Sequence, residues 1–325
     1  MKILLFDFTE KQLLKLKKMF PSIEFLIGSI YNKRKPTKKI IHNYLIESNA
    51  VIPFTRESTD WFFTSEFIDN YKNIEWVHLP GAGIEDCIVD NFSNANFVIT
   101  NGKIIQGTQV ADHAMALLLF LTRGLNIYSN SINLKSSQRP IELKNLHMLI
   151  IGFGGVGTAI YERARGFGMK ISIVTDQFPP SQKNIEKMYF SNDLIEAIPT
   201  ADVICMAAPL TERTYKLINQ DVINQMKKGV YFINVSRGKT VSMDAIIHGL
   251  KNNYFSGVGL DVTDPEPLEK NHEIYRYSNV IVTPHIGGMS SPAYIERSLN
   301  LIINNIKRFS IDLPLLNIVD KEEGY

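Results

Sequence analysis

The second half of the chain alternates short apolar runs with amphipathic stretches so regularly that few folds can accommodate it. Six runs of strand length are separated by stretches whose apolar residues recur at helical spacing. The runs span residues 147–152, 171–175, 203–207, 231–235, 257–261 and 280–283. Strands that alternate with helices form a parallel sheet with helices on both faces, because each crossover returns the chain to the same edge of the sheet. This half of the sequence therefore predicts a doubly wound α/β domain.

The first apolar run of this series leads directly into a glycine-rich turn that opens a helix. The turn matches the pattern GxGxxG and contains Gly152, Gly154, Gly155, Val156 and Gly157. In such a turn the first glycine permits a tight bend, the second lets a pyrophosphate approach the backbone, and the third lets helix and strand pack closely. The helix N-terminus then faces the anion. Strand, turn and helix together predict a dinucleotide-binding site.

An acidic residue stands at the end of the next predicted strand. Asp176 follows Gly157 by 19 residues, which is where a carboxylate accepts hydrogen bonds from the adenosine ribose hydroxyls. A carboxylate there repels a 2′-phosphate, and no basic residue follows before Lys183. The sequence therefore predicts NAD rather than NADP as the cofactor.

The N-terminal part shows a similar but less regular alternation. Apolar runs at 3–6, 23–27, 50–53 and 75–79 are expected to be strands, and 61–71 a helix. The last of these strands ends in a turn at Ala82 and Gly83. Because open α/β sheets bind ligands beyond the carboxyl ends of their strands, these two residues are candidates for backbone contacts with a substrate. A plain tight turn explains them equally well.

Two long helices are expected outside these alternating units. The stretch 108–123 is apolar almost all round, which indicates a helix buried against another surface, such as a second domain or a second subunit. The stretch 290–311 is expected to form a closing helix. A chain of 325 residues exceeds the usual size of one compact domain, so two domains are expected.

Composition excludes several classes of function. Hydrophobic residues make up 45% and charged residues 21%, and the formal charge is +2, so no general attraction to nucleic acid or membranes is expected. A basic cluster at Lys33, Arg34, Lys35, Lys38 and Lys39 is interpreted as a solvated loop or the start of a helix, because no aromatic residues interleave it.

The cysteines and histidines also narrow the possibilities. Two cysteines without CxxC spacing favour a soluble protein of the reducing cytoplasm. Seven histidines without paired ligand spacing predict no metal site.

Three polar side chains follow predicted strands of the regular half. Arg237 comes after 231–235, Glu266 after 257–261, and His285 after 280–283. Each alone has an ordinary explanation, as a surface arginine, a loop acid between two prolines, or a loop histidine. Because the carboxyl ends of parallel strands share one edge, where the nucleotide is also expected, the three together indicate a catalytic set.

With these residues in place, the chain resembles the D-isomer-specific 2-hydroxyacid dehydrogenases over nearly its whole length. Beyond the segments already described, the resemblance rests on Val110 to Ala114, Ala208 to Thr211 with Thr214, Gly259 to Val262, and Pro314 to Asn317 with Gly324 and Tyr325. The resemblance implies a Rossmann NAD-binding domain at 103–287, inserted in a smaller flavodoxin-like α/β substrate domain formed by 1–102 and 288–325.

The resemblance also implies roles for individual residues. Arg237, Glu266 and His285 match the family's catalytic residues, and Ala82, Gly83, Arg237 and His285 are expected to contact a small 2-keto or 2-hydroxy acid. The cofactor site is expected to include, besides the glycine-rich turn and Asp176, the residues Ala208, Pro209, Thr214, Val235, Ser236, Asp261, Gly287 and Gly288. A homodimer is expected as well.

The residue types suit the reduction of a 2-keto acid. An imidazolium at His285 is a general acid, a carboxylate at Glu266 orients it, and the planar fork of Arg237 binds a carboxylate. The substrate itself, and the preferred direction of the reaction, are left open by these residues. An alternative is a dinucleotide-sensing interaction protein similar to the C-terminal-binding-protein corepressors, which share the fold and retain such residues.

Overall fold

We describe a computed structural model of the chain, which covers residues 1–31, 37–84, 87, 91–128, 139–177, 183–289 and 291–322. Of the basic cluster, Lys33, Arg34 and Lys35 lie outside these residues, whereas Lys38 and Lys39 are exposed in the first turn of a helix. The chain divides into two compact units. Unit 1 comprises Met1–Ile105 and Ser290–Tyr325, and unit 2 comprises Gln106–Met289.

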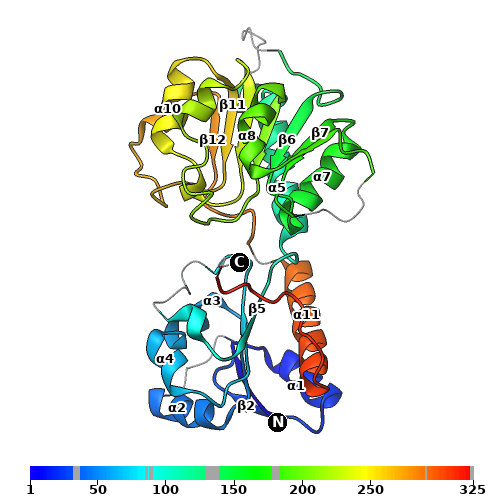
Figure 1. The fold of residues 1–325 in the computed structure, drawn as a ribbon, viewed down its shortest axis with the longest axis vertical. Helices are drawn as coiled ribbons and strands as arrows, with labels where there is room; N and C mark the ends of the chain where they lie inside the picture. Colours follow the sequence, from blue (N-terminus) through cyan, green and yellow to red (C-terminus); the bar gives the residue numbers. More distant parts are fainter. Residues whose placement is uncertain are drawn as a thin grey trace. The chain divides into compact units, whose positions relative to one another are not determined.

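Unit 1 is built on a five-stranded parallel sheet (Figure 1). Its strands are β1 (Lys2–Phe6), β2 (Glu24–Ile27), β3 (Ala50–Pro53), β4 (Trp76–Leu79) and β5 (Val98–Asn101). Its α-helices are α1 (Glu10–Met19), α2 (Lys38–Glu47), α3 (Arg56–Phe62), α4 (Ser65–Asn70) and α11 (Pro292–Ser310), with a short 3-10 helix η2 (Phe92–Asn94). The strand order β2-β1-β3-β4-β5 is that of flavodoxin-like sheets.

Alternating side chains of the strands divide the core of unit 1 into two layers. Ile3 and Leu5 of β1 point to the layer that holds α1 and α11, whereas Leu4 and Phe6 point to the layer that holds α2 and α4. Figure 1 shows these helix pairs on opposite sides of the sheet. With both faces covered, all four side chains are at most 2% exposed, as in other parallel sheets.

Unit 2 contains a seven-stranded parallel sheet with the order β12-β11-β10-β9-β6-β7-β8. Its strands are β6 (His147–Ile151), β7 (Lys170–Val174), β8 (Lys187–Tyr189), β9 (Val203–Met206), β10 (Val230–Asn234), β11 (Phe255–Leu260) and β12 (Val280–Val282). The order reverses between β6 and β9, which makes this the doubly wound dinucleotide-binding topology with one further strand. The predicted fold class is confirmed.

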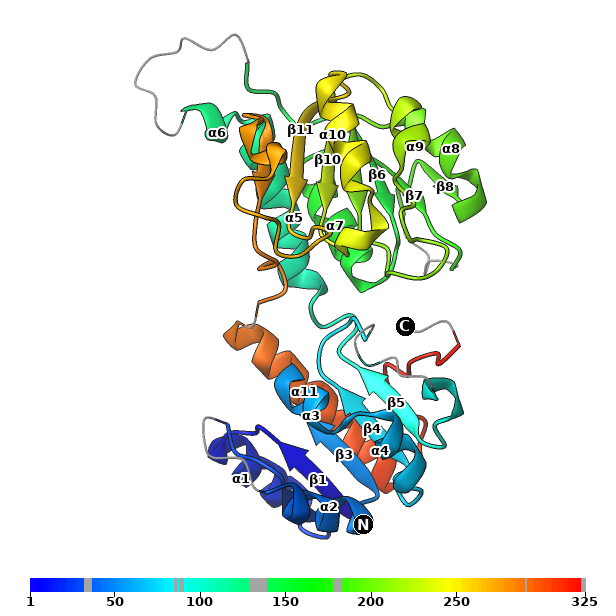
Figure 2. The same cartoon turned by 90° about the vertical axis from the view of Figure 1, so that its left-hand side faces the viewer.

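Helices cover both faces of this sheet. They are α5 (Gly107–Thr122), α6 (Leu125–Tyr128), α7 (Gly155–Gly166), α8 (Leu194–Ala197), α9 (Gln220–Asn224) and α10 (Met243–Lys251), with the 3-10 turns η3 (Ser191–Asp193), η4 (Ile198–Thr200), η5 (Gly238–Thr240) and η6 (Glu273–Arg276). One core layer holds α5 and α7, and the other holds α8, α9 and α10. Figure 2 shows α8, α9 and α10 together on one side of the sheet. Cys205 is buried in the first layer, where burial raises the pKa of its thiol to about 12.

Several expectations about single elements were wrong in detail. The stretch 61–71 is not one helix, because α3 ends at Phe62 and Thr64 caps α4 by accepting from the Phe67 amide. Strands β5 and β8 were not anticipated, since polar residues interrupt their short apolar stretches. The helix predicted at 108–123 is present as α5, which is buried against α7 and against strands β10 and β11. Among the described residues, no helix is long and apolar enough to cross a bilayer.

Candidate active site

The glycine-rich turn between β6 and α7 is fixed by contacts that only glycines allow. Gly152 has φ +94°, and a Cβ there would lie 2.4 Å from the Ala208 backbone. A Cβ on Gly157 would lie 2.1 Å from the Gly152 carbonyl oxygen. Gly154, the N-cap of α7, differs because nothing lies within 4 Å of its ideal Cβ position. The backbone is therefore open at Gly154, where a dinucleotide phosphate approaches, and tightly packed at the other two glycines.

A further glycine of the same kind lies in α5 and was missed by sequence reasoning. A Cβ on Gly107 would lie 2.4 Å from the carbonyl oxygen of Gly155, so the first turn of α5 presses on the first turn of α7. The sequence around Gly107 carries no recognisable turn or motif, so only the three-dimensional contact identifies its role.

Asp176 stands two residues beyond the end of β7, and its carboxylate is held by one serine. Oδ1 accepts a hydrogen bond from the Ser191 backbone amide at 2.9 Å, and Oδ2 accepts one from the Ser191 hydroxyl at 2.8 Å. Asp176 itself is exposed. The carboxylate is thus oriented in advance while each oxygen keeps a further lone pair. Ser191 lies 15 residues further on, and nothing in the sequence pattern marks it.

The turn after β9 carries the next predicted cofactor residues. Ala208 is buried against Gly152, and Pro209 is exposed. The Thr214 hydroxyl donates to the Pro209 carbonyl at 2.6 Å and accepts from the Thr211 amide at 2.8 Å. Thr214 therefore shapes this turn through hydrogen bonds of its side chain to the backbone.

Arg237 lies in a loop after β10 that is stabilised by hydrogen bonds with the side chain of Asn234. The Asn234 side chain accepts from the Ser236 amide at 3.0 Å and donates to the Arg237 carbonyl at 3.2 Å. Val235 and Ser236 are buried in this loop, and Arg237 is partly exposed. The guanidinium donates to the Ser236 carbonyl at 2.8 Å.

Gly238, the residue after Arg237, packs against the loop after β11. A Cβ on Gly238 would lie 1.8 Å from the Thr263 carbonyl oxygen, so the loops after β10 and β11 touch. This contact brings Arg237 close in space to the loop that carries Glu266.

Glu266 and His285 meet directly. The Nδ1 atom of His285 lies 2.7 Å from Oε1 of Glu266, and the two side chains are 42% and 38% exposed. His285 has φ +53°, and its amide donates to the carbonyls of Asp261 at 2.9 Å and Thr283 at 3.0 Å. Because Nδ1 is occupied by the carboxylate, Nε2 is the ring nitrogen left for other chemistry.

Asp261 holds the His285 loop to the end of β11. Its carboxylate accepts from the amides of Ile286 at 2.9 Å and Gly287 at 2.8 Å, and from the Thr283 hydroxyl at 2.6 Å. Nε2 of His113, from α5, lies 3.1 Å from Oδ1. Burial raises the pKa of the Asp261 carboxyl, but the hydrogen bonds from His113, Thr283, Gly287 and Ile286 outweigh this effect and lower the pKa to about 2.

Two further residues take part in the hydrogen-bonded group around Asp261. His113, from the apolar helix α5, is one of the partners of the Asp261 carboxylate. Gly287 packs closely against Asp261, since a Cβ on Gly287 would lie 2.8 Å from Oδ2 of Asp261. The carbonyl of Gly288 accepts a long hydrogen bond of 3.4 Å from the Gln106 side chain.

The three predicted catalytic residues follow three adjacent strands. The strands β10, β11 and β12 are neighbours in the sheet, and they precede Arg237, Glu266 and His285 respectively. The structure pairs Glu266 with His285 and places Arg237 on the neighbouring loop. Within the described residues, no group of three or more His, Cys, Asp or Glu side chains is arranged to hold a metal ion.

In unit 1, the turn after β4 is stabilised by the end of β5. Gly81 has φ +86°, and its carbonyl accepts from the Gly102 amide. The Asn101 side chain donates to the Ala82 carbonyl at 2.8 Å. Ala82 and Gly83 are partly exposed. The hydrogen bond from Asn101 thus holds the Ala82 carbonyl in place within unit 1 and fixes the turn that contains Gly83.

Comparison with known proteins agrees with this picture. Residues 115–287, more than half of the chain, match the family described as "D-isomer specific 2-hydroxyacid dehydrogenase, NAD binding domain". A glyoxylate reductase from Thermococcus litoralis is 28% identical over 301 residues, which cover 89% of this chain and 88% of that protein.

Solved structures share the fold over nearly the whole chain. The apo form of D-mandelate dehydrogenase from Rhodotorula graminis superposes with a TM-score of 0.82 at 22% identity, covering 98% of this chain and 97% of that one. A D-isomer specific 2-hydroxyacid dehydrogenase from Xanthobacter autotrophicus, in complex with NADPH and MES, gives a TM-score of 0.81 at 20% identity and 99% coverage of both chains. The predicted family and the predicted NAD cofactor are confirmed.

Proposed function

Because the chain belongs to the D-isomer-specific 2-hydroxyacid dehydrogenases, a family of NAD-dependent oxidoreductases, we propose that it interconverts a small 2-keto acid and the corresponding D-2-hydroxy acid. The observation that carries this proposal is the contact of 2.7 Å between His285 Nδ1 and Glu266 Oε1, beyond the carboxyl ends of the strands that form the NAD-binding sheet. A histidine paired in this way is a general acid and base.

His285 transfers the proton in this proposal. Reduction of a 2-keto acid adds a hydride to C2 and a proton to the C2 oxygen, and NADH supplies the hydride when it is bound. Nε2 of His285 donates the proton to the substrate oxygen. Glu266 accepts from Nδ1, which fixes the orientation of the ring. In the oxidation direction the neutral ring removes the same proton.

Arg237 and the turn after β4 bind the substrate carboxylate. The guanidinium offers a planar pair of donors that match the two carboxylate oxygens. The backbone amides of Ala82 and Gly83 add neutral donors. One nitrogen of the guanidinium already donates to the Ser236 carbonyl at 2.8 Å, which restricts the side chain before the substrate binds.

The dinucleotide binds along the same edge of unit 2. Gly154 is the residue that best supports this fit, because the space around its Cβ position is empty at the N-terminus of α7. The phosphate site consists of Gly152, Gly154, Gly155, Val156 and Gly157. The nicotinamide side consists of Ala208, Pro209, Thr214, Val235, Ser236, Asp261, Gly287 and Gly288. Asp176 accepts from the adenosine ribose hydroxyls and disfavours NADP.

We assign cofactor binding to unit 2, which also contributes Arg237 and His285 to the substrate, and we assign to unit 1 the substrate contacts of Ala82 and Gly83. We also propose a homodimer, which the family resemblance suggests and which light scattering of the purified protein tests by its mass.

Turnover with a panel of 2-keto acids tests the proposed function. NADH oxidation is followed by absorbance with glyoxylate, pyruvate, hydroxypyruvate and a branched 2-keto acid, and the same panel is repeated with NADPH. We expect turnover with at least one acid and a preference for NADH. Absence of turnover with every acid, while NADH still binds, contradicts the proposed reaction and favours a dinucleotide-sensing role. A preference for NADPH contradicts the role of Asp176.

A further inference from the structure

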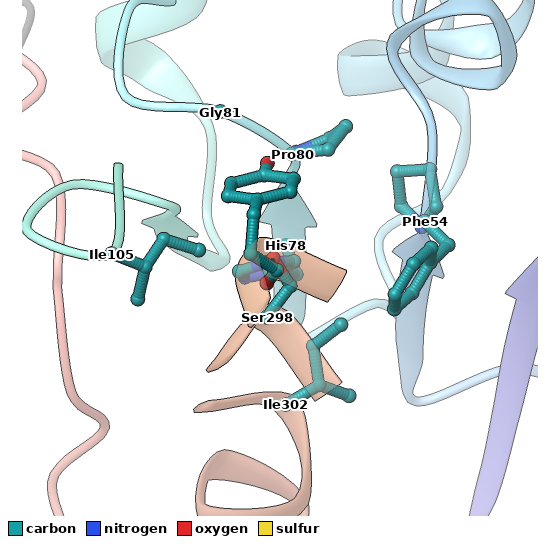
Figure 3. A pocket seen from close by; sticks show the side chains of 9 residues that line it. Phe54, His78, Pro80, Gly81, Ile105, Ser298 and Ile302 are labelled. Atoms are coloured by element: carbon teal, nitrogen blue, oxygen red, sulfur yellow. Dashed lines mark hydrogen bonds between the residues drawn. The ribbon is translucent and has the colours of Figure 1, made fainter. Parts of the chain in front are cut away.

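The turn after β4, which carries the two amides assigned to the substrate carboxylate, is held by residues 101–103. Figure 3 shows Gly81 at the start of this turn, where it lines a small pocket of unit 1. The Gly102 amide donates to the Gly81 carbonyl, and a Cβ on Gly102 would lie 2.8 Å from that carbonyl oxygen. The Asn101 side chain donates to the Ala82 carbonyl at 2.8 Å. The position of this segment therefore determines the position of the turn.

The same segment lies at the end of an edge strand. In the sheet of unit 1, β5 is the last strand and has β4 on one side. On its other side, residues 317–319 run antiparallel to it. The Asn101 amide donates to the Asn317 carbonyl at 3.1 Å, and the Val319 amide donates to the Ile99 carbonyl at 2.8 Å. These backbone hydrogen bonds cover the edge of the sheet.

The side chain of Asn317 makes contacts that covering the edge does not require. Its Nδ2 atom donates to the Lys103 carbonyl at 2.6 Å and to the Asn101 carbonyl at 3.3 Å. Lys103 lies two residues beyond the end of β5, in the segment that holds the turn. The backbone of Asn317 has φ +57°, a left-handed conformation that asparagine adopts more readily than most residues. The side-chain amide therefore acts on the segment beyond the strand.

The backbone next to Asn317 is itself fixed by α11. The Asn305 side chain accepts from the Leu316 amide at 2.8 Å and donates to the Leu316 carbonyl at 3.0 Å. Asn305 is 0% exposed, so these two hydrogen bonds are shielded from water. The Lys103 ammonium donates to the Ile318 carbonyl at 2.7 Å. Hydrogen bonds thus connect α11, through Asn317, to the segment that holds the substrate turn.

We propose that Asn317 is a positioning residue for substrate binding, which holds the amides of Ala82 and Gly83 where they receive the substrate carboxylate. This inference rests on the proposed function, which assigns the carboxylate to these amides. A displaced turn loses affinity, because a hydrogen bond weakens steeply when its donor is misaligned. The carboxylate keeps its charge throughout the reaction, so the loss affects the substrate and the transition state equally. The effect is therefore expected in KM and not in kcat.

The kinetics of Asn317→Gly and Asn317→Ala test this inference. Both variants lack the side-chain amide, but glycine adopts the left-handed backbone without strain and alanine does not. We expect both variants to raise the KM of every 2-keto acid roughly 3- to 10-fold, the effect of losing one hydrogen bond between neutral groups. We expect kcat and the dissociation constant of NADH to stay within about 2-fold of wild type. Asn317→Ala should have a lower melting temperature than Asn317→Gly, whereas KM should rise equally in both.

The matched control is Asn253→Gly. Asn253 is an exposed asparagine of unit 2 with φ +56°, so the same substitution is made at the same backbone conformation. This variant should keep the wild-type KM for the 2-keto acids. Folded Asn317 variants with the wild-type KM, or a KM that rises only in the less stable Asn317→Ala, overturn the inference, while turnover itself still supports the proposed reaction.

Hydrogen exchange tests the same contact without turnover. In the apoprotein, mass spectrometry follows exchange of the peptide that contains residues 80–84. We expect faster exchange in both Asn317 variants than in wild type and in Asn253→Gly. Unchanged exchange overturns the inference. If the wild-type protein turns over no 2-keto acid, faster exchange in the variants shows that Asn317 holds the turn, and the failure lies in the proposed function.

Discussion

Replacing Asp261 by Asn should destabilise the protein and displace His285. The carboxylate is 3% exposed and accepts hydrogen bonds from two amides and a hydroxyl at 2.6 to 2.9 Å, with His113 at 3.1 Å. Its pKa of about 2 in the folded protein, against 3.8 for the unperturbed group, corresponds to about 2 kcal/mol of stabilisation at pH 7. Asn also turns one acceptor into a donor that faces the Ile286 or Gly287 amide. We therefore expect a loss of roughly 2 to 4 kcal/mol in the free energy of unfolding.

The pH dependence identifies the charge as the cause. A carboxyl whose pKa is lowered by folding stabilises the protein above its unfolded pKa, and this contribution is lost as the pH falls from 3.8 towards 2. Urea unfolding of wild type and Asp261→Asn should show a constant difference from pH 7 to 5 and loss of about half of the charge contribution at pH 3. Asp312→Asn, at an exposed position, is the control. Equal stability of Asp261→Asn and wild type at pH 7 refutes the reasoning.

Two further predictions concern the cofactor. Gly154→Ala should fold normally but bind NADH at least several-fold more weakly, because the added Cβ occupies only the space at the start of α7. Gly157→Ala should instead lower the melting temperature of the apoprotein, because its Cβ would lie 2.1 Å from the Gly152 oxygen. Equal thermal stability of the two variants contradicts the packing argument. Because Ser191 donates two hydrogen bonds to Asp176, Ser191→Ala should raise the KM for NADH several-fold at nearly unchanged kcat and reduce the preference for NADH over NADPH. Ser191→Thr should restore both properties. An unchanged KM in Ser191→Ala shows that Asp176 does not need the hydrogen bonds from Ser191.

The fold of unit 2 could be predicted because its apolar runs are clear and alternate regularly with helical stretches along the chain. Six of its strands are apolar runs, of which five are mostly buried and β12 is partly buried, and the predicted runs match the observed strands within one or two residues. The strands β5 and β8 were missed because neither is a continuous apolar run: β5 ends in Thr100 and Asn101, and β8 begins with Lys187. The two-helix structure at α3 and α4 depended on a single cap, Thr64, inside an apolar stretch.

In the candidate site, too, the sequence identified the residues that follow strands or lie in motifs but not the partners that hold them in place. Sequence alone named Glu266 and His285, since both follow strands of one sheet. It did not reveal that Ser191 holds Asp176, that Gly107 touches Gly155, or that His113 reaches Asp261. These partners are separated by 15 to 148 residues, and their contacts arise from packing. No spacing rule connects them.

The central claim is that His285 is the general acid of the reaction, and the kinetics of His285→Ala test it most directly. The measurement is kcat for reduction of the best 2-keto acid, together with the dissociation constant of NADH from fluorescence titration. We predict a loss of kcat of roughly 10²- to 10⁴-fold with NADH binding within about 2-fold of wild type. A variant that folds, binds NADH and retains wild-type kcat would contradict the mechanism.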